Sequence, residues 1–255
     1  MAIVIAIAHM TLLEALRNRL VWLAGVVMLS ALGLGMFLDQ IAITESLEIR
    51  IALVAALLRA AAAFIVVTFS ISSVVREAND KVIDLFLSLP TPRSAYFFGK
   101  LAGFALVAIA IALMLSLPLL AYAPAARLWP WTVSLGFELL ILASASLFCA
   151  LSLAQTVTAF AAMAAFYLLS RSIAAIQMIA STGIQGRDSL IDKVIEGGVH
   201  GISLMLPAFD HMTMSGWLIE SPVSGAALLE MLAQALLYMV LIGAASLFDL
   251  YRKSL

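Results

Sequence analysis

The chain has 255 residues, of which 64% are hydrophobic and only 11% are charged, and its mean hydropathy is +1.13. A soluble domain carries roughly 45–50% apolar and about 25% charged residues, so this composition excludes an ordinary water-soluble globular protein. The 14 Lys and Arg residues against 15 Asp and Glu residues give a formal charge of −1. Because nucleic-acid binding needs a basic surface, we expect no nucleic-acid partner.

The sequence holds one cysteine, Cys149, which excludes an intramolecular disulfide and a cysteine-cluster metal site. It contains neither a G-x-x-x-x-G-K-[ST] loop nor a G-x-G-x-x-G loop, the common phosphate-binding signatures. We therefore expect no cofactor and no metal in this chain. The composition predicts an all-α integral membrane protein, with residues 1–255 forming one transmembrane domain.

Residues 3–19 are predicted to form a helix that lies at the membrane surface. From His9 onward the residues divide into an apolar face and a polar face: Leu12, Leu13, Leu16 and Leu20 on the first, and Thr11, Glu14, Arg17 and Asn18 on the second. A helix with this pattern lies in the interface instead of crossing the membrane. The alternative, in which these residues extend the first span, would bury Glu14 and Arg17.

Six stretches are long and apolar enough to cross about 30 Å of hydrocarbon, which takes about 20 residues in a helix. These predicted spans are 20–38, 51–75, 96–122, 133–153, 156–180 and 226–248. The fourth and fifth are separated only by a short uncharged polar break, and their combined length is too great for a single crossing.

The distribution of Lys and Arg predicts the orientation. Placing both termini and the loop 76–95 on one side collects eight cations there and leaves four on the other side. We therefore expect both termini and this loop in the cytoplasm. On the external side, the long connection 181–225 is predicted to contain two short helices, separated at Gly197–Gly198, although a loop folded against the membrane is an equal alternative.

The segment 76–93 carries the most informative pattern. An apolar stripe at helical spacing predicts a short amphipathic helix over 77–89, which Pro90 and Pro92 end. Glu77 and Lys81 are spaced to pair on this helix. Such a helix between two spans suits docking of a soluble partner, and the alternative is a solvated helix on the inner leaflet.

Residues of this region resemble the signature of ABC-2-type transporter permeases. The matching residues are Arg76-Glu77, Leu85-Phe86-Leu87-Ser88-Leu89-Pro90, Arg93, Tyr96 and Gly99-Lys100. The resemblance implies an N-terminal elbow helix, six spans, a coupling helix between spans two and three, and a dimeric permease core. Lys81 departs from the pattern, because many members have glycine there. Leu206-Pro207-Ala208-Phe209-Asp210 further resembles a motif of the NosY-like branch, the permeases linked to multicopper-enzyme maturation.

The resemblance implies a bacterial inner-membrane exporter subunit, not an enzyme, driven by a separate cytoplasmic ATPase that binds ATP and Mg. The residues expected to contact that ATPase are the polar Arg76, Glu77, Asp80, Lys81, Asp84 and Arg93 and the apolar Phe86 and Leu89. Two copies, or one copy and a homologue, would enclose a path that alternates between inward and outward access. Membrane lipid and a periplasmic accessory protein are further expected partners.

Two other function classes are alternatives to an exporter subunit. The first is a membrane component of a cofactor, multicopper or cytochrome maturation system, which also uses an ATPase. The second is an intramembrane enzyme acting on lipids, which the sparse polar inventory of the spans argues against. No nucleophile–base spacing predicts a catalytic triad, and the external run His211-Met212-Thr213-Met214 is too compact to favour a Cu(I) site.

The charged residues that lie well inside predicted spans, away from the span ends, are Arg59, Glu138 and Arg171. Charges at membrane depth are expensive and indicate functional sites. The two arginines lie at similar depth, about 12–14 Å below the outer surface at helical rise, with Glu138 somewhat shallower. We expect either an Arg–Glu pair in the interior or a cationic lining for an anionic substrate or a lipid headgroup. We favour a structural pair for one arginine and a role in the path for the other, and Glu138 could instead reach toward the surface.

Overall fold

A computed structural model describes residues 2–41, 46–81, 92–153, 155–182, 190–219 and 223–252. Every element in these ranges is helical. The α-helices are α1 (Ala2–Arg17), α2 (Leu20–Ile41), α3 (Ser46–Asn79), α5 (Arg93–Ser116), α6 (Ala125–Leu153), α7 (Thr156–Thr182), α8 (Leu190–Met205), α9 (Gly216–Ile219) and α10 (Gly225–Arg252). Two 3-10 helices complete the described elements, η1 (Leu117–Ala121) and η2 (Phe209–His211).

Six helices are long and apolar enough to cross a membrane: α2, α3, α5 with η1, α6, α7 and α10. They coincide with the six predicted spans, and the predicted break between the fourth and fifth is confirmed, since α6 ends at Leu153 and α7 begins at Thr156. Helices α3 and α6 extend beyond their predicted bounds, 51–75 and 133–153. The protein is an all-helical, multi-pass membrane protein.

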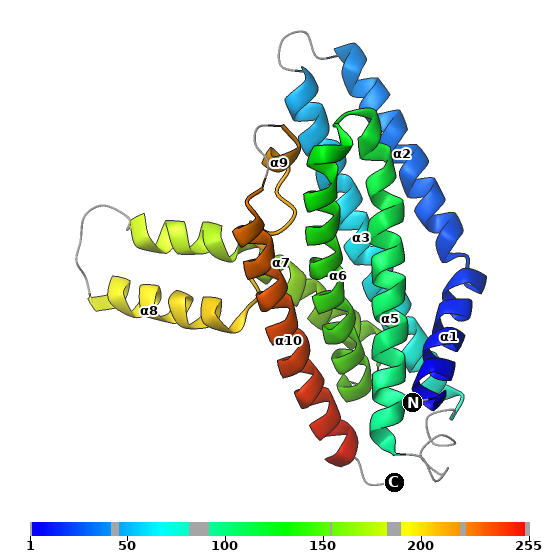
Figure 1. The fold of residues 1–255 in the computed structure, drawn as a ribbon. Helices are drawn as coiled ribbons and strands as arrows, with labels where there is room; N and C mark the ends of the chain where they lie inside the picture. Colours follow the sequence, from blue (N-terminus) through cyan, green and yellow to red (C-terminus); the bar gives the residue numbers. More distant parts are fainter. Residues whose placement is uncertain are drawn as a thin grey trace.

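Helix α6 is the centre of the bundle. It packs against α3, α5, α7 and α10. Of its most apolar 18-residue stretch, 67% is buried inside the protein, whereas the corresponding share is 22% for each of α2, α7 and α10. Leu135, Leu139 and Leu142 of α6 are fully buried. The two chain ends and the last turn of α3 lie at the same end of the bundle (Figure 1), which we call the terminal end.

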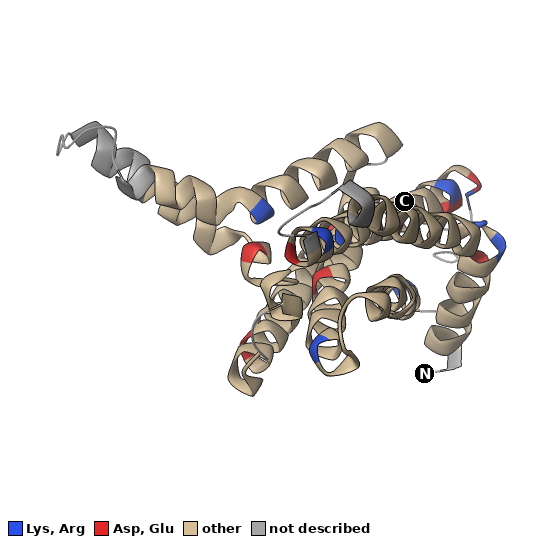
Figure 2. Ribbon diagram, turned by 90° about the horizontal axis from the view of Figure 1, so that it is seen from above, with Lys and Arg blue, Asp and Glu red and all other residues tan. Residues whose placement is uncertain are grey.

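The C-terminal part of α7 and the described part of α8 project sideways from the other helices in both views (Figures 1 and 2). Helix α8 runs unbroken through Gly197 and Gly198, so the predicted break at these glycines is wrong. A glycine costs only about 1 kcal/mol relative to alanine inside a helix, and the neighbouring residues keep the helix intact. The helix ends at Met205, shortly before Pro207, which cannot continue it.

Helix α1 covers nearly the residues of the predicted N-terminal helix, 3–19, and it packs on α5 through Thr11 of the predicted polar face. Thr11 is buried against α5, whereas Leu13 and Leu16 are exposed. The contact is close because Gly99 and Gly103 of α5 lie beneath α1: a Cβ at Gly103 would be 2.6 Å from Cβ of Thr11. Helices in lipid bury small and polar residues against each other and leave large apolar ones outside, which explains why Thr11 is buried while Leu13 and Leu16 are exposed.

Replacing Gly103 by alanine should weaken the packing of α1. The added methyl group overlaps Thr11 at its branch point, and overpacking of this kind costs about 1–3 kcal/mol. Thermal unfolding of the purified protein should therefore show a lower midpoint for Gly103→Ala. The matched control is Gly136→Ala in α6, where nothing lies within 4 Å of the added atom. Equal midpoints for the two variants would contradict the close packing of α1 on α5.

Candidate functional site

A buried ion cluster lies at the terminal end, centred on Lys100 of α5. The Lys100 side chain is 3% exposed, and its Nζ lies 2.6 Å from Oε1 of Glu77 and 3.6 Å from Oε2 of Glu14. The ammonium group also donates to Oγ of Ser73 at 3.2 Å. A buried ammonium group is stable only when opposite charges and hydrogen-bond acceptors surround it, and here two carboxylates and a hydroxyl do so.

The two carboxylates have further partners. Tyr96 donates its hydroxyl to Oε2 of Glu77 at 2.8 Å, Ser73 donates to Oε2 of Glu14 at 3.0 Å, and Arg76 donates to Oε1 of Glu14. We call these six residues, Glu14, Ser73, Arg76, Glu77, Tyr96 and Lys100, the Lys100 cluster. It joins α1, α3 and α5 at one point.

The residues predicted to contact an ATPase fall into four groups. Arg76 and Glu77 belong to the Lys100 cluster, and Arg93 donates to the carbonyl of Leu250 in α10 at 3.3 Å. Asp80 and Lys81 are exposed. The remaining predicted contacts lie outside the described residues: Asp84, Phe86 and Leu89.

The predicted helix over 77–89 does not begin at Glu77, because residues 77–79 form the last turn of α3. Lys81 then adopts a φ of 55°, in the left-handed region that ends helices and favours glycine. The predicted pair of Glu77 with Lys81 is replaced by the pair of Glu77 with Lys100. Sequence spacing could not show this, because Lys100 lies on the next span. Residues 82–89 lie outside the described residues.

The three intramembrane charges meet in a second cluster, at α3, α6 and α7. Glu138 is completely buried, and Nη1 of Arg171 lies 3.9 Å from its Oε2. Both Arg59 and Arg171 also contact Thr213, which donates its hydroxyl to Oε2 of Glu138 at 2.6 Å. We call Arg59, Glu138, Arg171 and Thr213 the Glu138 cluster. Of the two predicted arrangements, the structure contains the interior Arg–Glu pair.

The residue that sequence reasoning missed is Thr213, and with it the whole segment 208–214. This segment follows α8 and enters the bundle, where Phe209, Met212 and Thr213 are fully buried. The Phe209 ring packs edge-on against Phe166, with centroids 6.1 Å apart, and the Thr213 amide donates to Oγ of Ser134 at 3.0 Å. The residue pattern of segment 208–214 does not by itself indicate that this segment folds into the bundle.

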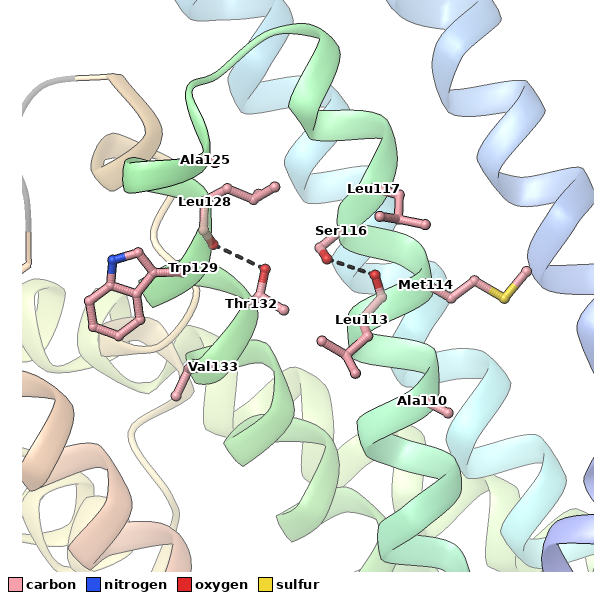
Figure 3. Close-up of a pocket in the computed structure, with 10 residues that line it drawn as sticks. All are labelled: Ala110, Leu113, Met114, Ser116, Leu117, Ala125, Leu128, Trp129, Thr132 and Val133. Carbon is pink, nitrogen blue, oxygen red and sulfur yellow. Dashed lines mark hydrogen bonds between the residues drawn. The ribbon is translucent and has the colours of Figure 1, made fainter.

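A large groove elsewhere offers no polar contacts. It has a volume of about 600 Å³ and lies between α5, η1 and the start of α6 (Figure 3). Its two hydroxyl groups are used within their own helices, since Ser116 donates to the carbonyl of Leu113 at 2.8 Å and Thr132 to that of Leu128 at 3.0 Å. With Trp129 half exposed at its edge, this mostly apolar groove suits apolar chains.

Among the described residues, no group of three or more His, Cys, Asp or Glu side chains could hold a metal ion. In the run His211-Met212-Thr213-Met214, Met212 is buried whereas His211 is exposed and lies 3.2 Å from Asp210. These two side chains do not share one site.

No profile of a known protein family matches the chain, and a comparison with curated proteins finds no match. The class of the protein therefore follows from its own structure: a six-span membrane protein with two internal ion clusters.

Removing the charge of Lys100 should destabilise the protein. Lys100→Met leaves the partly exposed carboxylate of Glu77 without its cation, whereas Glu14 keeps Arg76. We therefore expect a loss near the lower end of the about 3–5 kcal/mol that breaking a buried ion pair costs. The double variant Lys100→Met with Glu77→Gln should be more stable than Lys100→Met alone, because it removes one uncompensated charge. The midpoint of thermal unfolding in detergent measures the stability of both variants. The control is Lys81→Met, at an exposed lysine, whose midpoint should differ little from that of the parent. A double variant as unstable as the sum of its single variants would contradict the pairing.

Proposed function

We propose that this chain is the permease subunit of an ABC-2-type ATP-driven exporter of the bacterial inner membrane, with both termini in the cytoplasm. A separate ATPase subunit would bind and hydrolyse ATP with Mg. One observation carries the proposal: residues of the ABC-2-like signature from both ends of the loop, Arg76-Glu77 before it and Tyr96 and Lys100 after it, meet in the Lys100 cluster. Residues of the signature that are far apart in the sequence therefore share one buried cluster of contacts.

The position of the cluster suits the transmission of force. The loop that would dock on the ATPase begins after α3 ends at Asn79, close to Glu77, and returns into α5 at Arg93, shortly before Tyr96. Because the cluster ties both helix ends to each other and to α1, a displacement of this loop moves three helices together. Gly99, another residue of the signature in α5, allows the close approach of Ile7 of α1.

In this proposal Arg76 and Glu77 position the loop, and Asp80 and Lys81, which are exposed, contact the ATPase. Asp84, Phe86 and Leu89 keep their proposed role as contacts. A second copy of the chain, or a homologue, would complete the path, and α1 would be an elbow helix at the inner leaflet. A membrane component of an enzyme-maturation system would use the same ATPase contacts.

Reversing exposed charges beside the loop should weaken ATPase binding. The variant Asp80→Arg with Lys81→Glu, expressed with its ATPase, should reduce the amount of ATPase that co-purifies by about tenfold, equivalent to about 1.4 kcal/mol. Neither side chain belongs to the Lys100 cluster, so insertion and thermal stability should be retained.

The control is Glu48→Arg, a charge reversal at an exposed residue at the other end of α3. It should co-purify with the ATPase as the parent does. If the Asp80/Lys81 variant co-purifies as well as the control does, the docking surface is misassigned; if the parent retains no ATPase at all, the proposed function is wrong.

A further inference from the structure

Two intramembrane arginines hold the segment 208–214 by its main chain. Arg59 donates to the carbonyl of Thr213 at 3.0 Å, and Arg171 donates to the carbonyl of Met212 at 2.9 Å and to that of Phe209. Guanidinium groups bind anions with two parallel hydrogen bonds more strongly than neutral carbonyls. These carbonyls are therefore weaker acceptors than a phosphate or a carboxylate would be.

The charges of this region balance only while the segment is in place. Arg59 and Arg171 are opposed by Glu138 and, at longer range, by Asp210, which acts on Arg171 electrostatically. Asp210 belongs to the segment, whereas the other three belong to the bundle. When the segment leaves, it removes Asp210 and the carbonyls together, and two cations face one carboxylate. One anionic group restores the balance.

An unused hydrogen-bonding group lies in the same place. In the part of the chain that the structure describes, buried Nε of Arg59 has no hydrogen-bond acceptor. Buried polar atoms without partners are uncommon and indicate a site that is incomplete. The donor on Arg59 is available to an incoming anion without breaking an existing bond.

The docked segment is also strained. Thr213 has a φ of 49°, and a β-branched residue in this left-handed region costs about 1–2 kcal/mol. The hydrogen bonds of Thr213 to Glu138 and Ser134 offset this cost. Release of the segment relieves this strain, which reduces the free energy that a competing anion must supply to displace it.

We propose that Arg59 and Arg171 are the receptor for an anionic group, phosphate or carboxylate, on the molecule that this protein transports, and that the carbonyls of segment 208–214 occupy the receptor at rest. Binding of the anion exchanges weak neutral acceptors for a charged one and releases the segment. The inference deepens the proposed function by naming the substrate class. That the bound anion is transported rests on the proposed function, whereas binding of the anion does not.

The test uses the full chain in phosphatidylcholine nanodiscs, with Cys149→Ser and a reporter cysteine at the buried Met212. Dodecyl phosphate should increase the rate at which a soluble maleimide modifies Cys at position 212 by about tenfold. Dodecyltrimethylammonium, with the same chain and the opposite charge, should not. A response to dodecyl phosphate alone assigns an anionic amphiphile, and an equal response to inorganic phosphate assigns a free anion.

Arg59→Gln removes one receptor arginine and can also loosen the segment, so a second measurement accompanies it. Dodecyl phosphate should raise the thermal unfolding midpoint of the parent by mass action, and should raise that of Arg59→Gln much less. Arg127→Gln is the matched control, because Arg127 donates to the carbonyl of Ile219 at 2.7 Å outside the cluster; it should respond as the parent does. No response to either phosphate, an equal response to the cationic amphiphile, or an undiminished midpoint shift in Arg59→Gln overturns the proposal. None of these measurements involves an ATPase, so their failure is distinct from failure of the proposed function.

Discussion

A charge inside hydrocarbon must find its partner within the protein, and this constraint organises the structure. Two charged side chains of the described residues are essentially inaccessible, Lys100 and Glu138, and each is the centre of a cluster. Lys100 gathers groups from α1, α3 and α5, whereas Glu138 gathers groups from α6, α7 and the segment 208–214. In both cases the charge dictates which helices must lie side by side, and apolar packing fills the space between.

Helix α3 belongs to both clusters. It supplies Arg59 to one and Ser73, Arg76 and Glu77 to the other, and at 1.5 Å per residue these positions are about 21–27 Å apart along the axis. A continuous helix transmits an axial displacement over this length. Under the proposed function, a movement that an ATPase imposes beside Lys81 reaches Arg59, and a change in the contacts of Arg59 reaches the terminal end. The two clusters are then the two ends of one mechanical connection.

The sequence predicted those features of the fold that depend on the composition of long stretches of the chain. The six spans, the break after Leu153 and the meeting of Arg59, Glu138 and Arg171 follow from the thickness of the hydrocarbon and from the cost of an unpaired charge. Features that depend on which elements meet were not predictable. The outward face of α1 depends on Gly103 of α5, the partner of Glu77 is on another span, and the inward course of segment 208–214 depends on arginines of α3 and α7.

The claim on which the account rests is that the turn after α3 faces the side of the membrane where ATP is present. Single cysteines at Asp80 and at Glu48, each in a Cys149→Ser background, test it directly in intact cells with a membrane-impermeant maleimide. The account predicts that the cysteine at position 80 is modified only after the cells are opened and that the one at position 48 is modified from outside. Modification at position 80 in intact cells would contradict the account.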